Sequence, residues 1–163
     1  VLLAYVLFMM PDPAVGLREA TRVLQPGGTI GTVTWGAEEP SVAAKTWDAI
    51  LAEFGVPALP AHSNHSGLDT ADRVSTLLTH AGLAPGDVWC ETIDATFEPD
   101  EFWRLRTMHG TNGVRLAGID PARREVVLAA LRGRLATLRR SDYEFGGTLV
   151  CSISTKSTDG GRP

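Results

Sequence analysis

The chain has 163 residues, which is enough for one domain with a real hydrophobic core. Its 44% hydrophobic and 21% charged residues are typical of a globular protein. The net charge of -4 gives no bias towards nucleic acid or an anionic membrane, so we expect neither as a partner.

The first ten residues are apolar, and Val1–Leu3 are predicted to form a buried parallel strand. The run is too short to cross a bilayer, and it lacks the basic leader and the cleavage site of a signal peptide. A loop or short turn is predicted from Tyr5 to Met10. We therefore expect this chain to be the C-terminal part of a larger α/β domain whose N-terminal half is missing.

A helix is predicted from Pro13 to Leu24 and a strand from Thr29 to Trp35. Asp12 is suited to cap that helix, and a proline is well tolerated in the first helical turn. The pair Gly27–Gly28 then provides the positive φ that a helix end requires. The strand is predicted from its β-branched and aromatic residues.

The rest of the chain alternates between helical and extended patterns. Helices are predicted at Ser41–Phe54, Thr70–Ala81, Pro99–Met108 and Pro121–Arg140, and strands at Asp87–Phe97 and Tyr143–Thr155, the last interrupted at Gly146–Gly147. The order β-α-β-α-α-β-α-α-β predicts an α/β sheet. We expect one partial domain over residues 1–156 and a disordered tail over residues 157–163.

The segment LREATRVLQPGGTIGTVTW resembles the stretch after the fourth strand of class I S-adenosylmethionine-dependent methyltransferases. The matching positions are Leu17, Glu19, Arg22, Val23, Leu24, Pro26, Gly27 and Gly28. Asp69–Leu83 resembles the helix before strand six of that family, and Thr148–Ser154 would be strand seven. The resemblance implies a Rossmann-like methyltransferase sheet, of which this chain holds strands four to seven. It is closest to the methyltransferase type 11, quinone-biosynthesis-like group.

The resemblance also implies S-adenosylmethionine as the cofactor. The family's glycine-rich loop after strand one and the acidic residue ending strand two hold much of that cofactor, and both belong to the missing half. We therefore expect the cofactor to bind only when that half is present. Leu3, Ala4 and Tyr5 would line its methionine end and the methyl group; the alternative is that they are ordinary core or strand residues.

Four aromatic or imidazole side chains are predicted on the acceptor side: Tyr5, Trp35, Trp103 and His109. The last two lie in an insertion before the final strand, which often shapes the acceptor pocket in this family; a structural surface role is the alternative. His62 and His65 lie in an irregular loop and are predicted to be solvated. Methyl transfer depends mainly on positioning, and no residue is identified as a catalytic base.

The expected function is methyl transfer to a small organic acceptor in the intact protein, with this chain inactive by itself. The alternative is a degenerate or truncated methyltransferase-like module that acts as a non-catalytic association domain. An exposed sheet edge would favour a homo-oligomer in that case. No metal-ligand spacing occurs. Cys90 and Cys151 are predicted to be buried thiols, which favours a reducing, cytoplasmic location.

Overall fold

The structure of the chain, a computed structural model, describes residues 1–58 and 67–158. The chain divides into two compact units, which are described separately below. Unit 1 comprises residues 1–38, 62–93 and 147–163, and unit 2 comprises residues 39–61 and 94–146. Within the described residues, the boundaries between the units fall in three long strands, β2 (Thr29–Glu39), β3 (Leu83–Thr96) and β4 (Glu144–Lys156).

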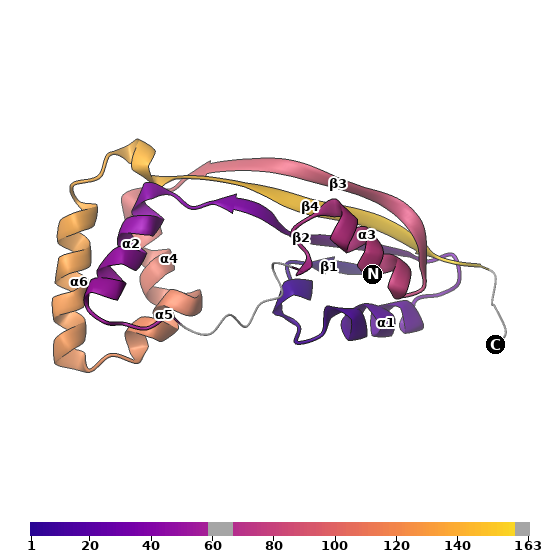
Figure 1. Cartoon of the computed structure of the whole chain (residues 1–163), viewed down its shortest axis with the longest axis horizontal. Coiled ribbons are helices and arrows are strands. Elements are labelled where there is room, and N and C mark those ends of the chain that lie inside the picture. The colour runs from indigo at the N-terminus through magenta and orange to yellow at the C-terminus, as the bar shows by residue number, and fades with distance from the viewer. Residues whose placement is uncertain (59–66, 159–163) are drawn as a thin grey trace. The chain divides into compact units, whose positions relative to one another are not determined.

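A mixed sheet in the order β1-β2-β4-β3 forms the framework of unit 1 (Figure 1). The short strand β1 (Leu2–Ala4) runs parallel to β2, as the sequence predicted. The final strand lies between β2 and β3 and runs antiparallel to β2. Its Lys156 N–H donates to the Gly28 carbonyl at 2.9 Å, and the Ser152 and Thr32 hydroxyls share a hydrogen bond of 2.6 Å. The α/β fold class is therefore confirmed.

Strand β1 differs from its prediction in extent and in burial. It covers Leu2–Ala4 rather than Val1–Leu3, and Leu2 is 71% exposed. The prediction of a buried strand was wrong because β1 is a terminal strand of this sheet and pairs with β2 alone within the described residues.

Two α-helices cover one face of the unit 1 sheet, α1 (Pro13–Val23) and α3 (Ala71–His80), with a 3₁₀ turn η1 (Leu7–Met9) before α1. Asp12 caps α1 as predicted, because its carboxylate accepts from the Ala14 and Val15 N–H groups. Alternate residues of β2 face these helices and are buried. The core of unit 1 consists of Leu7, Leu17, Ile30, Leu68, Val74, Leu78, Ala81, Leu83 and Val150.

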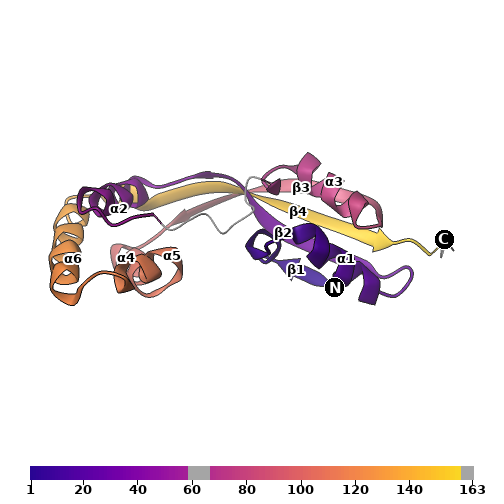
Figure 2. The same cartoon turned by 60° about the horizontal axis from the view of Figure 1, so that its bottom comes forward.

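Four α-helices and a 3₁₀ turn make up most of unit 2: α2 (Val42–Glu53), α4 (Pro99–Met108), α5 (Gly110–Ala117), α6 (Pro121–Leu135) and η3 (Arg140–Tyr143). Within the unit, α2 packs on α6 and α4 packs on α5 (Figure 2). Their core consists of Ala43, Ala44, Trp47, Ile50, Leu51, Val56, Phe102, Leu116, Val127, Leu131, Leu135 and Tyr143.

Helix α5 is an element that the sequence patterns did not predict. Its segment GTNGVRLA contains two glycines and an asparagine, which have low helix propensity, yet Leu116 is fully buried and fixes the helix on the core. Helix α6 ends at Leu135 rather than at Arg140, and Ser41 and Thr70 act as caps rather than helical residues.

The long strands also extend beyond their predicted limits. Strand β2 continues past Trp35 to Glu39, and β3 begins at Leu83 rather than at Asp87. Strand β4 runs without interruption through Gly146–Gly147. Pairing with neighbouring strands therefore overrides the weak strand propensity of glycine at these positions.

Gly86 of β3 lies directly against the backbone of β4. A Cβ atom there would lie 1.9 Å from the Ile153 carbonyl oxygen. We expect Gly86→Ala to lower the free energy of unfolding by about 1–3 kcal/mol, because strand backbone must move to admit the methyl group. Urea unfolding followed by circular dichroism measures this effect.

The matched control for Gly86→Ala is Gly133→Ala in α6, where an added Cβ would meet nothing within 4 Å. Because alanine is the better helix former, this change is expected to raise the free energy of unfolding by about 0.5–1 kcal/mol. Shifts of the same sign for both variants would contradict the steric argument.

Candidate functional site

The carboxyl end of β1 brings together two of the residues predicted for the acceptor side. The Tyr5 ring lies against the Trp35 ring with the centroids 5.2 Å apart and the planes tilted by 45°. The Tyr5 N–H donates to the Val33 carbonyl at 2.8 Å, which fixes the backbone directly after the strand. Sequence positions 30 residues apart thus form one aromatic pair in unit 1.

Tyr5 has an unusual backbone conformation. Its φ is 55°, and within residues 1–58 and 67–158 it is the single non-glycine residue with a positive φ. This left-handed region costs a bulky residue roughly 1–2 kcal/mol. Such strain persists only where the surroundings enforce it, and it is frequent at functional positions. Tyr5 as a residue is still 40% exposed, so it remains open to a ligand.

Leu3 and Ala4 lie in β1 itself, next to this aromatic pair. Leu3 aligns with Thr32 and Ala4 with Val33 in the parallel register. In open α/β sheets, ligands bind beyond the carboxyl ends of the strands, which is where this segment ends. The structure therefore groups Leu3, Ala4, Tyr5 and Trp35 at one sheet end, and their roles remain predictions.

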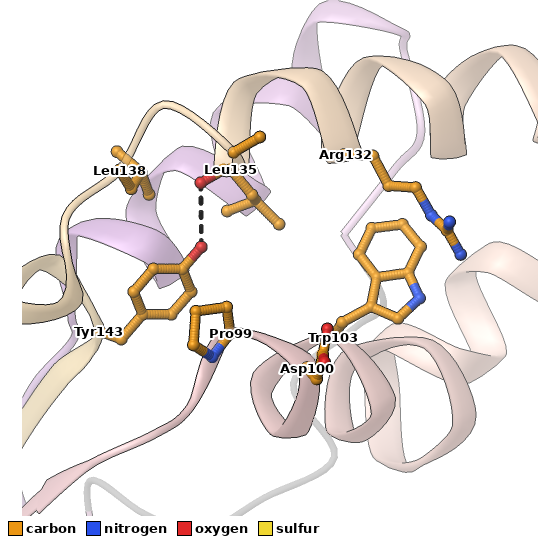
Figure 3. A pocket seen from close by; sticks show the side chains of 8 residues that line it. Pro99, Asp100, Trp103, Arg132, Leu135, Leu138 and Tyr143 are labelled. Atoms are coloured by element: carbon orange, nitrogen blue, oxygen red, sulfur yellow. Dashed lines mark hydrogen bonds between the residues drawn. The ribbon is translucent and has the colours of Figure 1, made fainter.

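Trp103 lines a cavity of about 310 Å³ in unit 2 (Figure 3). The walls come from α4, from α6 with the turn after it, and from η3: Pro99, Asp100, Trp103, Arg132, Leu135, Ala136, Leu138 and Tyr143. Most of this surface is apolar, which suits a small organic molecule. Trp103 is held by edge-on packing against Trp47, with the centroids 5.7 Å apart.

Two polar side chains of this cavity have fixed positions. The Arg132 guanidinium lies 4.6 Å from the centroid of the Trp103 ring, a cation–π geometry. The Tyr143 hydroxyl donates to the Leu135 carbonyl at 3.0 Å (Figure 3). Burial, with the nearby Asp142, raises the pKa of Tyr143, so its hydroxyl stays protonated at neutral pH. Sequence patterns offered no sign of Arg132 and Tyr143, because they lie 29 and 40 residues beyond Trp103.

His109 is not part of the Trp103 cavity. It is an exposed residue between α4 and α5, and its side chain makes no capping hydrogen bond. Its role on the acceptor side therefore remains a prediction. His62 and His65 lie outside the described residues.

The described residues contain no candidate metal cluster, no candidate membrane span and no disulfide. No group of three or more His, Cys, Asp or Glu side chains is placed to hold a metal ion there, and no helix there is long and apolar enough to span a membrane. Both cysteines are free. The prediction of a buried Cys90 was wrong, because β3 is a terminal strand and exposes that side chain, whereas Cys151 in the inner strand β4 is partly buried.

The comparison with curated proteins finds a methyltransferase. A curated relative, methyltransferase tpcH of Aspergillus fumigatus, is 31% identical over 95 residues. That match includes 58% of this chain, but it spans only 30% of the relative's length. No family model matches the chain.

One of the solved structures that resemble this chain supports the fold. A candidate methyltransferase, BH2331 of Bacillus halodurans C-125, superposes on 97% of this chain and 69% of its own, with a TM-score of 0.52 and 18% identity. A phosphoethanolamine N-methyltransferase 2 of Haemonchus contortus, solved with S-adenosyl-L-methionine, superposes with a TM-score of 0.41 and 12% identity over 96% of this chain and 33% of its own. The superposition on BH2331 shows that the chain has a Rossmann-like methyltransferase fold.

Proposed function

We propose that the protein transfers a methyl group from S-adenosylmethionine to a small organic acceptor. The observation that carries this proposal is the strained Tyr5 at the carboxyl end of β1, packed on Trp35, in a chain with a methyltransferase fold. Open α/β sheets bind their ligands at this end. The 31% identity to methyltransferase tpcH supports the same reaction class.

The methionine end of this cofactor is proposed to lie against Leu3, Ala4 and Tyr5. The strand end is apolar, and an exposed aromatic face lies next to it, which favours a cationic group such as a sulfonium. The cofactor supplies a methyl group activated by that positive sulfur. The task of these residues is to hold and orient it and to exclude water, since alignment is the main requirement of such a displacement.

The acceptor side is proposed to include Tyr5, Trp35, Trp103 and His109. Two observations support it: the first two form one aromatic pair, and Trp103 lines a mostly apolar cavity in its own unit. We place the protein closest to the type 11, quinone-biosynthesis-like group, on the strength of the RVLQPGG segment. The two free cysteines support a cytoplasmic location, because the cytosol keeps thiols reduced.

Calorimetric titration with S-adenosylhomocysteine tests the proposal. This chain and the longest reading-frame product that contains it are titrated in parallel, and we expect binding by the longer polypeptide. In the polypeptide that binds, Tyr5→Ala should weaken affinity about tenfold, because the ring contact is lost. Tyr5→Phe is the control, since it keeps the ring, and it should bind within about threefold of wild type.

A second function is favoured if neither polypeptide binds the cofactor product. The chain would then act as a non-catalytic association module, and strand β1 offers the surface for it. In this terminal strand Leu2 is 71% exposed, and Val1 directly before the strand is 50% exposed. Exposed strand edges pair readily with a second chain, so a homo-oligomer is the expected product. Size-exclusion chromatography with light scattering would detect it.

A further inference from the structure

A second pocket, of about 460 Å³, lies in unit 2. This volume is within the range of about 300–1,000 Å³ that is usual for small-molecule sites. The lining comes from α2 and the residues that follow it, from α4 and from α5: Asp48, Ala52, Val56, Ala58, Arg106, Thr111, Asn112 and Arg115. The pocket shares no lining residue with the Trp103 cavity, so the two are separate sites.

Arg115 forms one wall of the pocket and is fixed by four hydrogen bonds. Its guanidinium donates to the Asp48 carboxylate at 2.9 Å and to the Asn112 side-chain oxygen at 3.2 Å. It also donates to the carbonyls of Val56 and Pro57 at 3.3 and 3.1 Å. The side chain is only 9% exposed. The charge of Arg115 is therefore paired with that of Asp48, and most of its N–H donors already have acceptors.

Arg106 is the second cation of the pocket, and its situation is different. The side chain is half-buried and lies over the Phe102 ring at 5.2 Å, and no hydrogen bond to its guanidinium occurs among the residues that the structure describes. Burial lowers the pKa of Arg106, Asp48 opposes this effect, and Arg115 adds to it. Since a guanidinium remains charged in proteins, an anion beside it would offset this unfavourable environment.

The other polar groups of the pocket also favour an anion. The Asn112 side-chain oxygen accepts from Arg115, which leaves the amide NH₂ group of Asn112 with its two donors. The Thr111 hydroxyl adds a further donor to the lining. The one carboxylate, Asp48, is already paired. Two cations against one anion leave a net charge of +1.

We propose that this pocket binds the carboxylate of a small organic monoanion, with Arg106 as its charged partner. The planar guanidinium matches a carboxylate with two parallel hydrogen bonds. Asn112 and Thr111 supply additional donors. Ala52, Val56 and Ala58 are small apolar residues that leave room for the body of the ligand. This site does not depend on the methyl-transfer proposal.

Benzoate is the probe for this site, and benzamide is its neutral counterpart of the same shape. The folded chain is titrated with each, and backbone and arginine Nε signals are followed by ¹H–¹⁵N NMR. We expect benzoate to shift signals of α4 and α5 and to bind about tenfold more tightly than benzamide. Inorganic phosphate is the third probe of the titration, and it is expected to bind more weakly than benzoate.

Variants on α4 identify the residue responsible. Arg106→Gln should weaken benzoate binding about tenfold, whereas Arg104→Gln, an exposed arginine of the same helix, should leave it within about twofold. Circular dichroism checks that both variants fold. Arg106→Lys keeps the charge but lacks the planar fork, so it should also bind more weakly than wild type.

Several results would overturn the proposal. They are the absence of benzoate binding, equal affinity for benzoate and benzamide, tighter binding of phosphate, and wild-type affinity in both Arg106 variants. The expected order of affinities, with loss in the Arg106 variants alone, would establish the site.

Discussion

Arg115→Met is expected to lower the free energy of unfolding by about 1–3 kcal/mol. The guanidinium is 9% exposed and joins α5 to Asp48 of α2 and to the carbonyls of Val56 and Pro57. Methionine replaces much of the volume but none of the donors. The carbonyls of Val56 and Pro57 then lose a charged donor, which costs about 1–3 kcal/mol where water cannot replace it, whereas the Asp48 carboxylate is 56% exposed and is hydrated. Urea unfolding at constant salt measures the change.

Arg134→Met provides the matched control for this prediction. Arg134 also joins its helix to α2, through Glu53 at 3.3 Å, but both side chains are more than half exposed. Exposed ion pairs contribute about 0–1 kcal/mol, so this variant should be nearly as stable as wild type. Equal losses for the two arginines would contradict the assignment of Arg115 as the buried link of unit 2.

Trp47→Ala is expected to lower the free energy of unfolding by about 3–5 kcal/mol. The indole is fully buried, and it packs edge-on against Phe102 and Trp103 with centroid distances of 6.2 and 5.7 Å. Removing it opens a cavity at the centre of unit 2 and removes the support of the Trp103 ring. Hydrogen exchange resolved by residue should show the loss of protection in α2 and α4.

Two control variants separate packing from polarity at Trp47. Its indole N–H has no hydrogen-bond partner among the described residues, so Trp47→Phe loses no such bond and should cost less than Trp47→Ala. Trp89→Ala removes the same type of side chain from an exposed position in β3, where the residue is 37% exposed, and should cost less than about 1.5 kcal/mol. A larger loss of unfolding free energy for Trp89→Ala than for Trp47→Ala would contradict the assignment of Trp47 to the main core of unit 2.

Local sequence signals predicted much of the framework. Asp12–Pro13 marked the start of α1, because capping depends on residues next to one another. The end of the helix differs from the prediction: α1 ends at Val23 with Leu24 in an extended conformation, and the positive φ of Gly27 belongs to the turn that follows. The helix predicted over Pro121–Arg140 is also observed, as α6. These signals act over one or two turns and are readable without knowledge of the fold.

The candidate site was predictable only in part. Tyr5 was selected because the resemblance to methyltransferases puts it directly after strand four, and the structure places it against Trp35. Its positive φ had no signal in the sequence, since such backbone strain is imposed by tertiary packing. The Trp103 cavity and the Arg106 pocket combine helices separated by tens of residues, and no spacing rule connects them.

The sequence by itself determined the alternation of helices and strands and the likeness to methyltransferases, because both depend on short patterns of turns, caps and apolar residues. The tertiary structure decided the insertion of β4 between β2 and β3, the helix α5, and the different surroundings of Arg115 and Arg106. The physical reason is that burial and long-range pairing depend on the whole fold. The fold decides which carbonyls and carboxylates lie beside a guanidinium. It therefore decides whether the N–H groups of that guanidinium already have acceptors or can bind a ligand.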